Sequence, residues 1–181
     1  MLKWQFDLGT AVAYHGHMNR PAIRCLILGC GNTLRGDDGV GPALCGWAEQ
    51  RFAGEAGVRI VARQQWTPEL AWEISAAESV IFIDCSLVSE PGVIVIQPVV
   101  PSQAEDNRAT HEISAPELLA LAKVLFGRSP LHAELLTIGA GSTEMGVIFS
   151  TAVQASVQAA QRALEGAVRR ALEASSDSTQ R

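Results

Sequence analysis

The sequence predicts an α/β fold in which a mostly parallel sheet is covered by helices on both faces. Short runs rich in β-branched residues and leucine alternate along the chain with segments of helical periodicity. The 181 residues are 48% hydrophobic and 18% charged, which is enough apolar material for one domain with a well-buried core. We expect five strands, at about 23–30, 57–63, 79–84, 93–98 and 133–139.

Four helices are expected between and after these strands. The segment at about 39–53 carries apolar residues at helical spacing. Thr67-Pro68-Glu69 is typical of a helix start, because threonine caps the first turn and proline is tolerated at the first helical position. Ser114-Ala-Pro-Glu117 has the pattern of a capping box. The last helix, at about 151–173, is rich in alanine and has one apolar stripe.

The connection between the third and fourth expected strands has a different character from the others. It covers residues 85–92 and is too short to hold a crossover helix. Parallel neighbours need such a crossover, whereas antiparallel neighbours do not. The sequence therefore predicts that the strands at 79–84 and 93–98 form an antiparallel hairpin.

Composition and charge exclude several classes of protein. A net charge of -5 and the absence of a basic stripe argue against a nucleic-acid partner. No apolar run approaches the roughly 20 residues that cross a bilayer, so we expect no membrane partner and a cytoplasmic location. We expect residues 1–22 to be a disordered or non-native leader with Met18 as the biological start, 23–174 to be the domain, and 175–181 to be a disordered tail.

The four cysteines predict reduced thiols. Cys25, Cys30, Cys45 and Cys85 form no C-x-x-C pair, and three of them lie in apolar segments where cysteine behaves as a small hydrophobic residue. Cys30 and Cys85 adjoin polar loops at strand ends, so a nucleophilic cysteine is an alternative. His111 would be its basic partner.

The loop after the first strand holds two adjacent carboxylates among five glycines. Asp37 and Asp38 lie in the loop that follows the strand, and Asp84 ends the third strand. Ligands of α/β sheets bind at the edge where parallel strands end, so these acids are expected to lie there. Leu34 stands where a dinucleotide-binding fingerprint needs its third glycine, and no Gly-Lys-Ser/Thr follows, so the sequence does not favour a nucleotide site.

A metal site is the alternative use of this edge. His111 precedes the third expected helix, whose dipole keeps an imidazole neutral and able to bind metal. If its loop folds over the sheet edge, Asp38, Asp84 and His111 would supply two oxygen ligands and one nitrogen ligand to a divalent transition metal. Adjacent carboxylates raise each other's pKa, so Asp37 or Asp38 would serve as a general base near neutral pH.

Three motifs together resemble the hydrogenase maturation endopeptidases, which trim the large subunit of nickel-iron hydrogenases. The matching residues are Leu28–Gly41, Phe82–Cys85 with Pro91-Gly92, and Thr110-His111, in the family's order and spacing over about 23–172. The resemblance implies a single-domain three-layer α/β/α sandwich with a five-stranded mixed sheet. It also implies a cytoplasmic, aspartyl-type endopeptidase that removes the C-terminal extension of the nickel-loaded large-subunit precursor.

The resemblance also implies roles for individual residues. Nickel would be supplied by the precursor and bound by Asp38, Asp84 and His111, while Asp38 with Asp37 would be catalytic. We expect Gly31, Asn32, Trp66 and Thr67 to contact the substrate. The sequence departs from many members at 64–70, where they carry a glycine-rich segment, and this difference bears on substrate specificity. A nucleotide- or nucleoside-binding domain and a non-catalytic hydrogenase assembly chaperone remain the alternatives.

Overall fold

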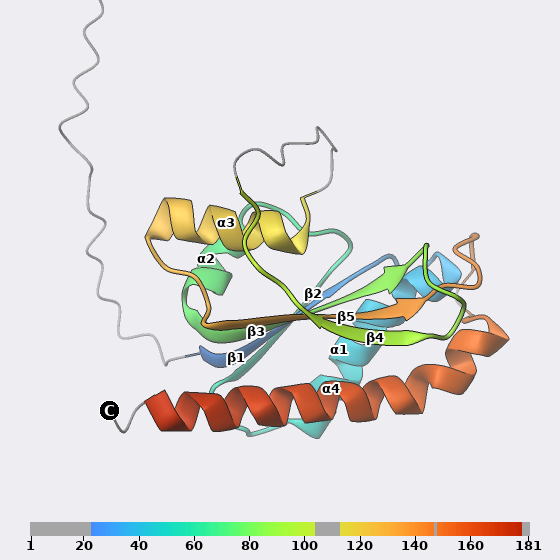
Figure 1. Ribbon diagram of the computed structural model, residues 1–181. Helices are drawn as coiled ribbons and strands as arrows, with labels where there is room; N and C mark the ends of the chain where they lie inside the picture. The colour runs from blue at the N-terminus through green and yellow to red at the C-terminus, as the bar shows by residue number, and fades with distance from the viewer. Residues whose placement is uncertain (1–22, 104–112, 147, 179–181) are drawn as a thin grey trace, which may run out of the picture.

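Three layers build the structure, which is a computed structural model that describes residues 23–103, 113–146 and 148–178. A five-stranded sheet lies between α1 and α4 on one face and α2 and α3 on the other (Figure 1). The predicted fold class is therefore confirmed. The strands are β1 (Ile23–Cys30), β2 (Val58–Arg63), β3 (Ala77–Ser86), β4 (Ile94–Pro98) and β5 (His132–Gly139). The helices are α1 (Val40–Arg51), α2 (Leu70–Ser75), α3 (Ala115–Phe126) and α4 (Thr151–Ser178).

The strand order corrects one prediction. The order is β2-β1-β3-β5-β4, with parallel pairing except between β4 and β5. The predicted hairpin of β3 and β4 is wrong, because β5 lies between them. A central strand needs apolar side chains on both faces, and β5 buries Leu136 and Ile138 while Leu135 packs on the opposite face. β4 ends in exposed Gln97 and Pro98, and proline cannot donate a ladder hydrogen bond, so β4 suits the sheet edge.

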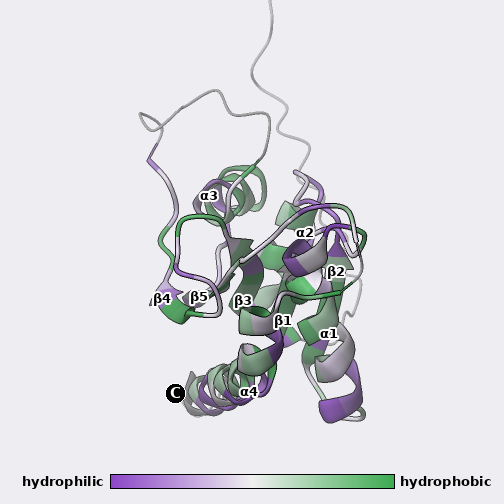
Figure 2. Cartoon of the chain, turned by 90° about the vertical axis from the view of Figure 1, so that its right-hand side faces the viewer, coloured by the Kyte–Doolittle hydropathy of each residue, from purple (hydrophilic) through white to green (hydrophobic). Residues whose placement is uncertain are grey.

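The two faces of β1 and β3 build two cores. Ile27, Ile81 and Ile83 pack against α1 and α4, whereas Leu26 and Phe82 pack against α2 and α3. Both strands are almost continuously buried, as expected for parallel strands covered on both faces. The polar residues that follow them lie at the edge where the parallel strands end, which faces the viewer in Figure 2.

Helix ends follow the sequence signals in part. The capping box of α3 is confirmed, with the Ser114 amide donating to Glu117 Oε2 at 2.7 Å. The second helix begins at Leu70 rather than at Thr67, because residues 67–69 form a turn in which the Leu70 amide donates to the Thr67 carbonyl. α4 continues to Ser178, beyond the predicted end, so the first residues of the predicted disordered tail are helical. Buried Ser175 donates to the Ala171 carbonyl at 3.0 Å.

Helix length and polarity bear on the membrane prediction. Within the described ranges, every helix is too short or too polar to span a bilayer.

Candidate functional site

Asp37 ties the loop after β1 to the loop after β5. It lies in a short turn, η1 (Gly36–Gly39), and its side chain is fully buried. Asp37 Oδ2 accepts hydrogen bonds from the amides of Gly141 at 2.7 Å and Ser142 at 3.0 Å, and Oδ1 accepts one from the Ser150 amide at 2.7 Å. Three charge-assisted bonds across about a hundred residues of sequence hold the two loops as one unit.

These bonds also decide the ionisation of Asp37. Burial alone would raise its pKa, but the hydrogen bonds from Ser150, Ser142 and Gly141 outweigh burial and lower the pKa below its ordinary value. The rise in pKa predicted from the adjacent carboxylate is therefore wrong for Asp37. A buried carboxylate with both oxygens engaged by backbone amides is suited to anchoring a loop, and the catalytic role predicted for Asp37 stays a prediction.

Asp38 points to the end of β3 instead. Asp38 Oδ2 accepts a hydrogen bond from the Asn32 amide at 2.9 Å, and Asp38 Oδ1 accepts one from Cys85 Sγ at 3.4 Å. Asp84 Oδ1 accepts a bond from the Cys85 amide at 2.8 Å. Asp38, Asp84 and Cys85 each offer one ligand atom, and these atoms lie within 4.8 Å of one another. The structure thus brings together the two predicted carboxylates of the metal site.

Cys85 is the residue that sequence reasoning left out of the ligand set. Its thiol is half-buried, and burial, then Asp84, Asp38 and Cys30 raise its pKa to about 12. A thiol that stays protonated near neutral pH is a poor nucleophile, so the alternative of a nucleophilic cysteine finds no support at Cys85. The signal available in the sequence was its position directly after Asp84. His111, the third predicted ligand, lies outside the described residues.

Two positions of the loop need glycine because another backbone segment lies too close to leave room for a Cβ atom. Gly31 has φ +137°, and a Cβ atom there would lie 1.8 Å from the Asp38 carbonyl oxygen. A Cβ atom at Gly41 would lie 2.1 Å from the Cys30 carbonyl oxygen. Only glycine allows the loop to fold back on the strand end at these two positions, and this fold presents the Asp38 side chain to Asp84.

The same loop is unsuited to a phosphate group. A phosphate cradle needs free backbone amides, but the amide of Gly31 donates to the Arg63 carbonyl, that of Asn32 to Asp38, and that of Gly36 to the Gly146 carbonyl. The loop already uses these donors to hold its own shape. The geometry therefore gives no support to the nucleotide-binding alternative.

The predicted substrate-contacting residues fall into two groups, with Gly31 and Asn32 beside Asp38 and Trp66 and Thr67 at a groove along α3. Asn32 donates its amide to Asp38, and its side-chain oxygen accepts the Leu34 amide at 2.9 Å. Trp66 stands edge-on to Phe82, with ring centroids 5.3 Å apart. Phe82 is two residues before Asp84 on β3. Trp66 and Thr67 line a groove of about 520 Å³ that extends along α3. The indole Nε1 is buried and has no hydrogen-bond partner among the described residues.

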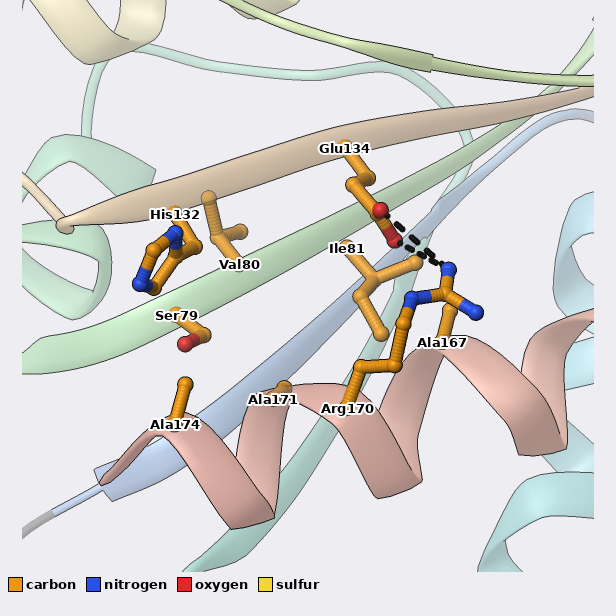
Figure 3. A pocket seen from close by; sticks show the side chains of 9 residues that line it. All are labelled: Ser79, Val80, Ile81, His132, Glu134, Ala167, Arg170, Ala171 and Ala174. Atoms are coloured by element: carbon orange, nitrogen blue, oxygen red, sulfur yellow. Dashed lines mark hydrogen bonds and ion pairs between the residues drawn. The ribbon is translucent and has the colours of Figure 1, made fainter. Parts of the chain in front are cut away.

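A second hollow lies at the opposite end of the sheet. It has a volume of about 250 Å³, lies between β3, β5 and α4, and is lined by alanines of α4 together with Ser79 and His132 (Figure 3). Arg170 pairs with Glu134 at its side, at 3.1 Å. Ser79 is five residues before Asp84 on the same strand, a separation of about 16 Å. This hollow is therefore separate from the acidic pair.

Several solved structures with a similar fold are maturation peptidases of hydrogenases. HybD of Escherichia coli, a hydrogenase maturating endopeptidase, is 25% identical with a TM-score of 0.63, over 81% of this chain and 93% of that one. HybD of Thermococcus kodakarensis, a NiFe hydrogenase maturation protease, is 25% identical with a TM-score of 0.59, over 79% of this chain and 97% of that one. The hydrogenase 2 maturation peptidase of a Thaumarchaeota archaeon is 27% identical with a TM-score of 0.55, over 80% of this chain and 97% of that one.

No family model and no curated protein matches the chain. The structural neighbours nevertheless confirm the resemblance that the sequence motifs indicated, since they cover most of the chain. They are peptidases, as the sequence predicted for this chain.

Proposed function

We propose that this chain is a cytoplasmic endopeptidase that removes the C-terminal extension from the nickel-loaded large-subunit precursor of a nickel-iron hydrogenase. The observation that carries the proposal is the convergence of Asp38 and Asp84 at the carboxyl edge of a sheet that hydrogenase maturation peptidases share. Oxygen ligands with an adjacent sulfur suit a divalent transition metal, and the metal here belongs to the substrate.

The ligands would position the substrate through its nickel. Asp38, Asp84 and His111 bind the nickel of the precursor, and Cys85 adds a sulfur atom at hydrogen-bond distance from Asp38. Bound in this way, the scissile peptide is held next to a carboxylate in a fixed geometry, and such positioning supplies a large part of catalysis in many enzymes. The metal is a recognition element that the substrate brings to the protein.

Asp38 is the better candidate for the general base. Asp37 is buried and engaged by three amides, whereas Asp38 is half-buried at the open edge. In the proposed reaction Asp38 takes a proton from a water molecule, and the hydroxide adds to the scissile carbonyl. The carbon–nitrogen bond then breaks, and the proton passes from Asp38 to the leaving amine.

A groove near the site can hold the departing extension. It is lined by Trp66 and Thr67 and extends along α3, and Trp66 packs on Phe82, which is two residues from Asp84 on β3. A polypeptide in this groove would pack against the Trp66 and Thr67 side chains that line it. We therefore assign substrate contacts to Trp66 and Thr67, and to Gly31 and Asn32 next to Asp38.

The proposal is tested with purified precursor in nickel-loaded and nickel-free forms. Each form is incubated with the protein, and the mass of the precursor is measured before and after. We expect the nickel-loaded form to lose the mass of its extension and the nickel-free form to stay intact. A complex without any loss of mass would indicate the assembly-chaperone alternative and overturn the proposed peptidase.

A further inference from the structure

Large apolar side chains are exposed around the acidic pair. We define the apolar rim as five residues with exposed fractions of 56% to 98%: Leu34, Leu87, Val88, Met145 and Ile148. They come from the loops that follow β1, β3 and β5, all at the carboxyl edge that faces the viewer in Figure 2. Single exposed apolar residues are ordinary, but a gathering on three loops around one site marks an interaction surface.

Hydrogen bonds join two of the three loops that carry the rim. The Gly146 amide donates to the Leu34 carbonyl at 2.9 Å, and the Gly36 amide donates to the Gly146 carbonyl at 2.6 Å. Asp37 adds its bonds to Gly141 and Ser150. The loop with Leu34 and the loop with Met145 and Ile148 therefore form one platform, and a preformed surface loses less conformational entropy on binding.

A hollow in the platform can accept a side chain from a partner. It has a volume of about 390 Å³ and lies between Leu34 and Phe149, with Pro42 and Ala43 of α1 at its base. Its walls are mostly apolar. Interfaces gain most of their affinity from a few large side chains that fill such hollows, surrounded by weaker contacts that exclude water.

We propose that the apolar rim is the docking surface for the folded body of the protein substrate. This inference rests on the proposed function, since a substrate whose scissile bond reaches Asp38 must lie against the rim. The departing extension is assigned to the groove beside Trp66, so the rim on the loops after β1, β3 and β5 is left for the rest of the substrate. The surface therefore fits a folded protein that presents an apolar patch, with one side chain entering the hollow beside Leu34.

The rim is tested by placing a charge in it. Ile148→Asp and Val88→Asp are compared with Leu131→Asp, a matched control because Leu131 is 76% exposed and lies just before β5 at the opposite edge. Affinity for immobilised nickel-loaded precursor is measured by biolayer interferometry, with KM and kcat from the mass assay. Melting temperatures of all variants are measured to show that each is folded.

We expect the two rim variants to bind the precursor at least tenfold more weakly and to show a similar rise in KM with little change in kcat. Leu131→Asp should behave as the unmodified protein does. Rim variants that bind within twofold of the unmodified protein would overturn the inference while leaving the peptidase intact. If the protein binds without cutting, the peptidase fails and the rim variants still decide the docking surface. If it does not bind the precursor, both fail.

Discussion

The two edges of the parallel sheet differ in how their loops are built. At the carboxyl edge, glycines let backbone segments approach closely, Asp37 and Asp38 bind backbone amides, and apolar side chains are exposed. At the amino edge, alanines of α4 leave a small hollow beside an exposed Glu134–Arg170 ion pair. The difference favours the carboxyl edge as the binding edge, because within the described ranges a cluster of possible ligand atoms lies only there, among anchored loops.

The strongest effect on stability is expected from Asp37→Asn. The amide keeps the shape of the side chain but removes the charge, and its NH₂ group would face backbone amides that need an acceptor. We expect the free energy of unfolding to fall by about 3 kcal/mol, measured by urea denaturation. Asp38→Asn, which alters a half-exposed group at the open edge, should cost less than half as much. Equal losses would contradict the distinct roles of the two acids.

Acid should remove the contribution of Asp37. Because its pKa is lower in the folded state than in the unfolded chain, Asp37 stabilises the fold above its unfolded pKa of about 3.9 and loses this effect as pH falls through the lower folded value. Urea denaturation at pH 7, 5, 4 and 3 should show the unmodified protein approaching Asp37→Asn in stability below about pH 4. Other carboxylates are common to both proteins and cancel in this difference. A difference that does not change with pH would contradict the assignment.

A moderate effect is expected in the groove beside Trp66. Trp66→Phe keeps a ring on Phe82 but removes part of the indole surface that lines the groove. If the substrate packs on that surface, KM for the precursor should rise about fivefold, equivalent to about 1 kcal/mol, with kcat unchanged. Trp72→Phe is the matched control, because the half-exposed Trp72 ring also stands edge-on to a phenylalanine, Phe126 of α3. The same KM for both variants would remove Trp66 from the substrate contacts.

The smallest effect is expected at the amino edge. The Ser79 hydroxyl is buried and has no hydrogen-bond partner among the described residues. Ser79→Ala should leave the free energy of unfolding unchanged or raise it by up to about 1 kcal/mol, because a buried unpaired hydroxyl is unfavourable. Precursor processing should proceed at the unmodified rate. A loss of processing would show that the amino edge also affects the reaction, which would contradict the functional difference between the two edges.

Local signals in the sequence predicted most of the fold. The capping box at Ser114 and the apolar runs of β1 and β3 depend on neighbours in the chain, and they were confirmed. The pairing of β4 could not be predicted from its short connection to β3, because the strand that separates them arrives later in the chain, after α3. Sequence adjacency says nothing of which strand will occupy the intervening position.

The sequence predicted that the two carboxylates lie at one edge, but it did not predict the residues that hold them in place. Asp38 and Asp84 were expected at one edge because both follow parallel strands, and the structure places them together. The sequence left the general base open between the two adjacent acids, although only Asp38 was expected to bind metal. Their difference depends on the amides of Gly141 and Ser150, a hundred residues away, which only the folded chain brings to Asp37. Cys85 was missed for a similar reason, because it meets Asp38 only when the end of β3 lies beside the loop after β1.

The central claim is that Asp38 and Asp84 form the processing site, and one comparison tests it directly. Cleavage rates of nickel-loaded precursor are measured by mass spectrometry for Asp38→Asn, Asp84→Asn and Glu134→Gln, the last altering a carboxylate at the amino edge. We predict a loss of at least about 100-fold for both carboxyl-edge variants and an unchanged rate for Glu134→Gln. Full cleavage by both Asp38→Asn and Asp84→Asn would contradict the account.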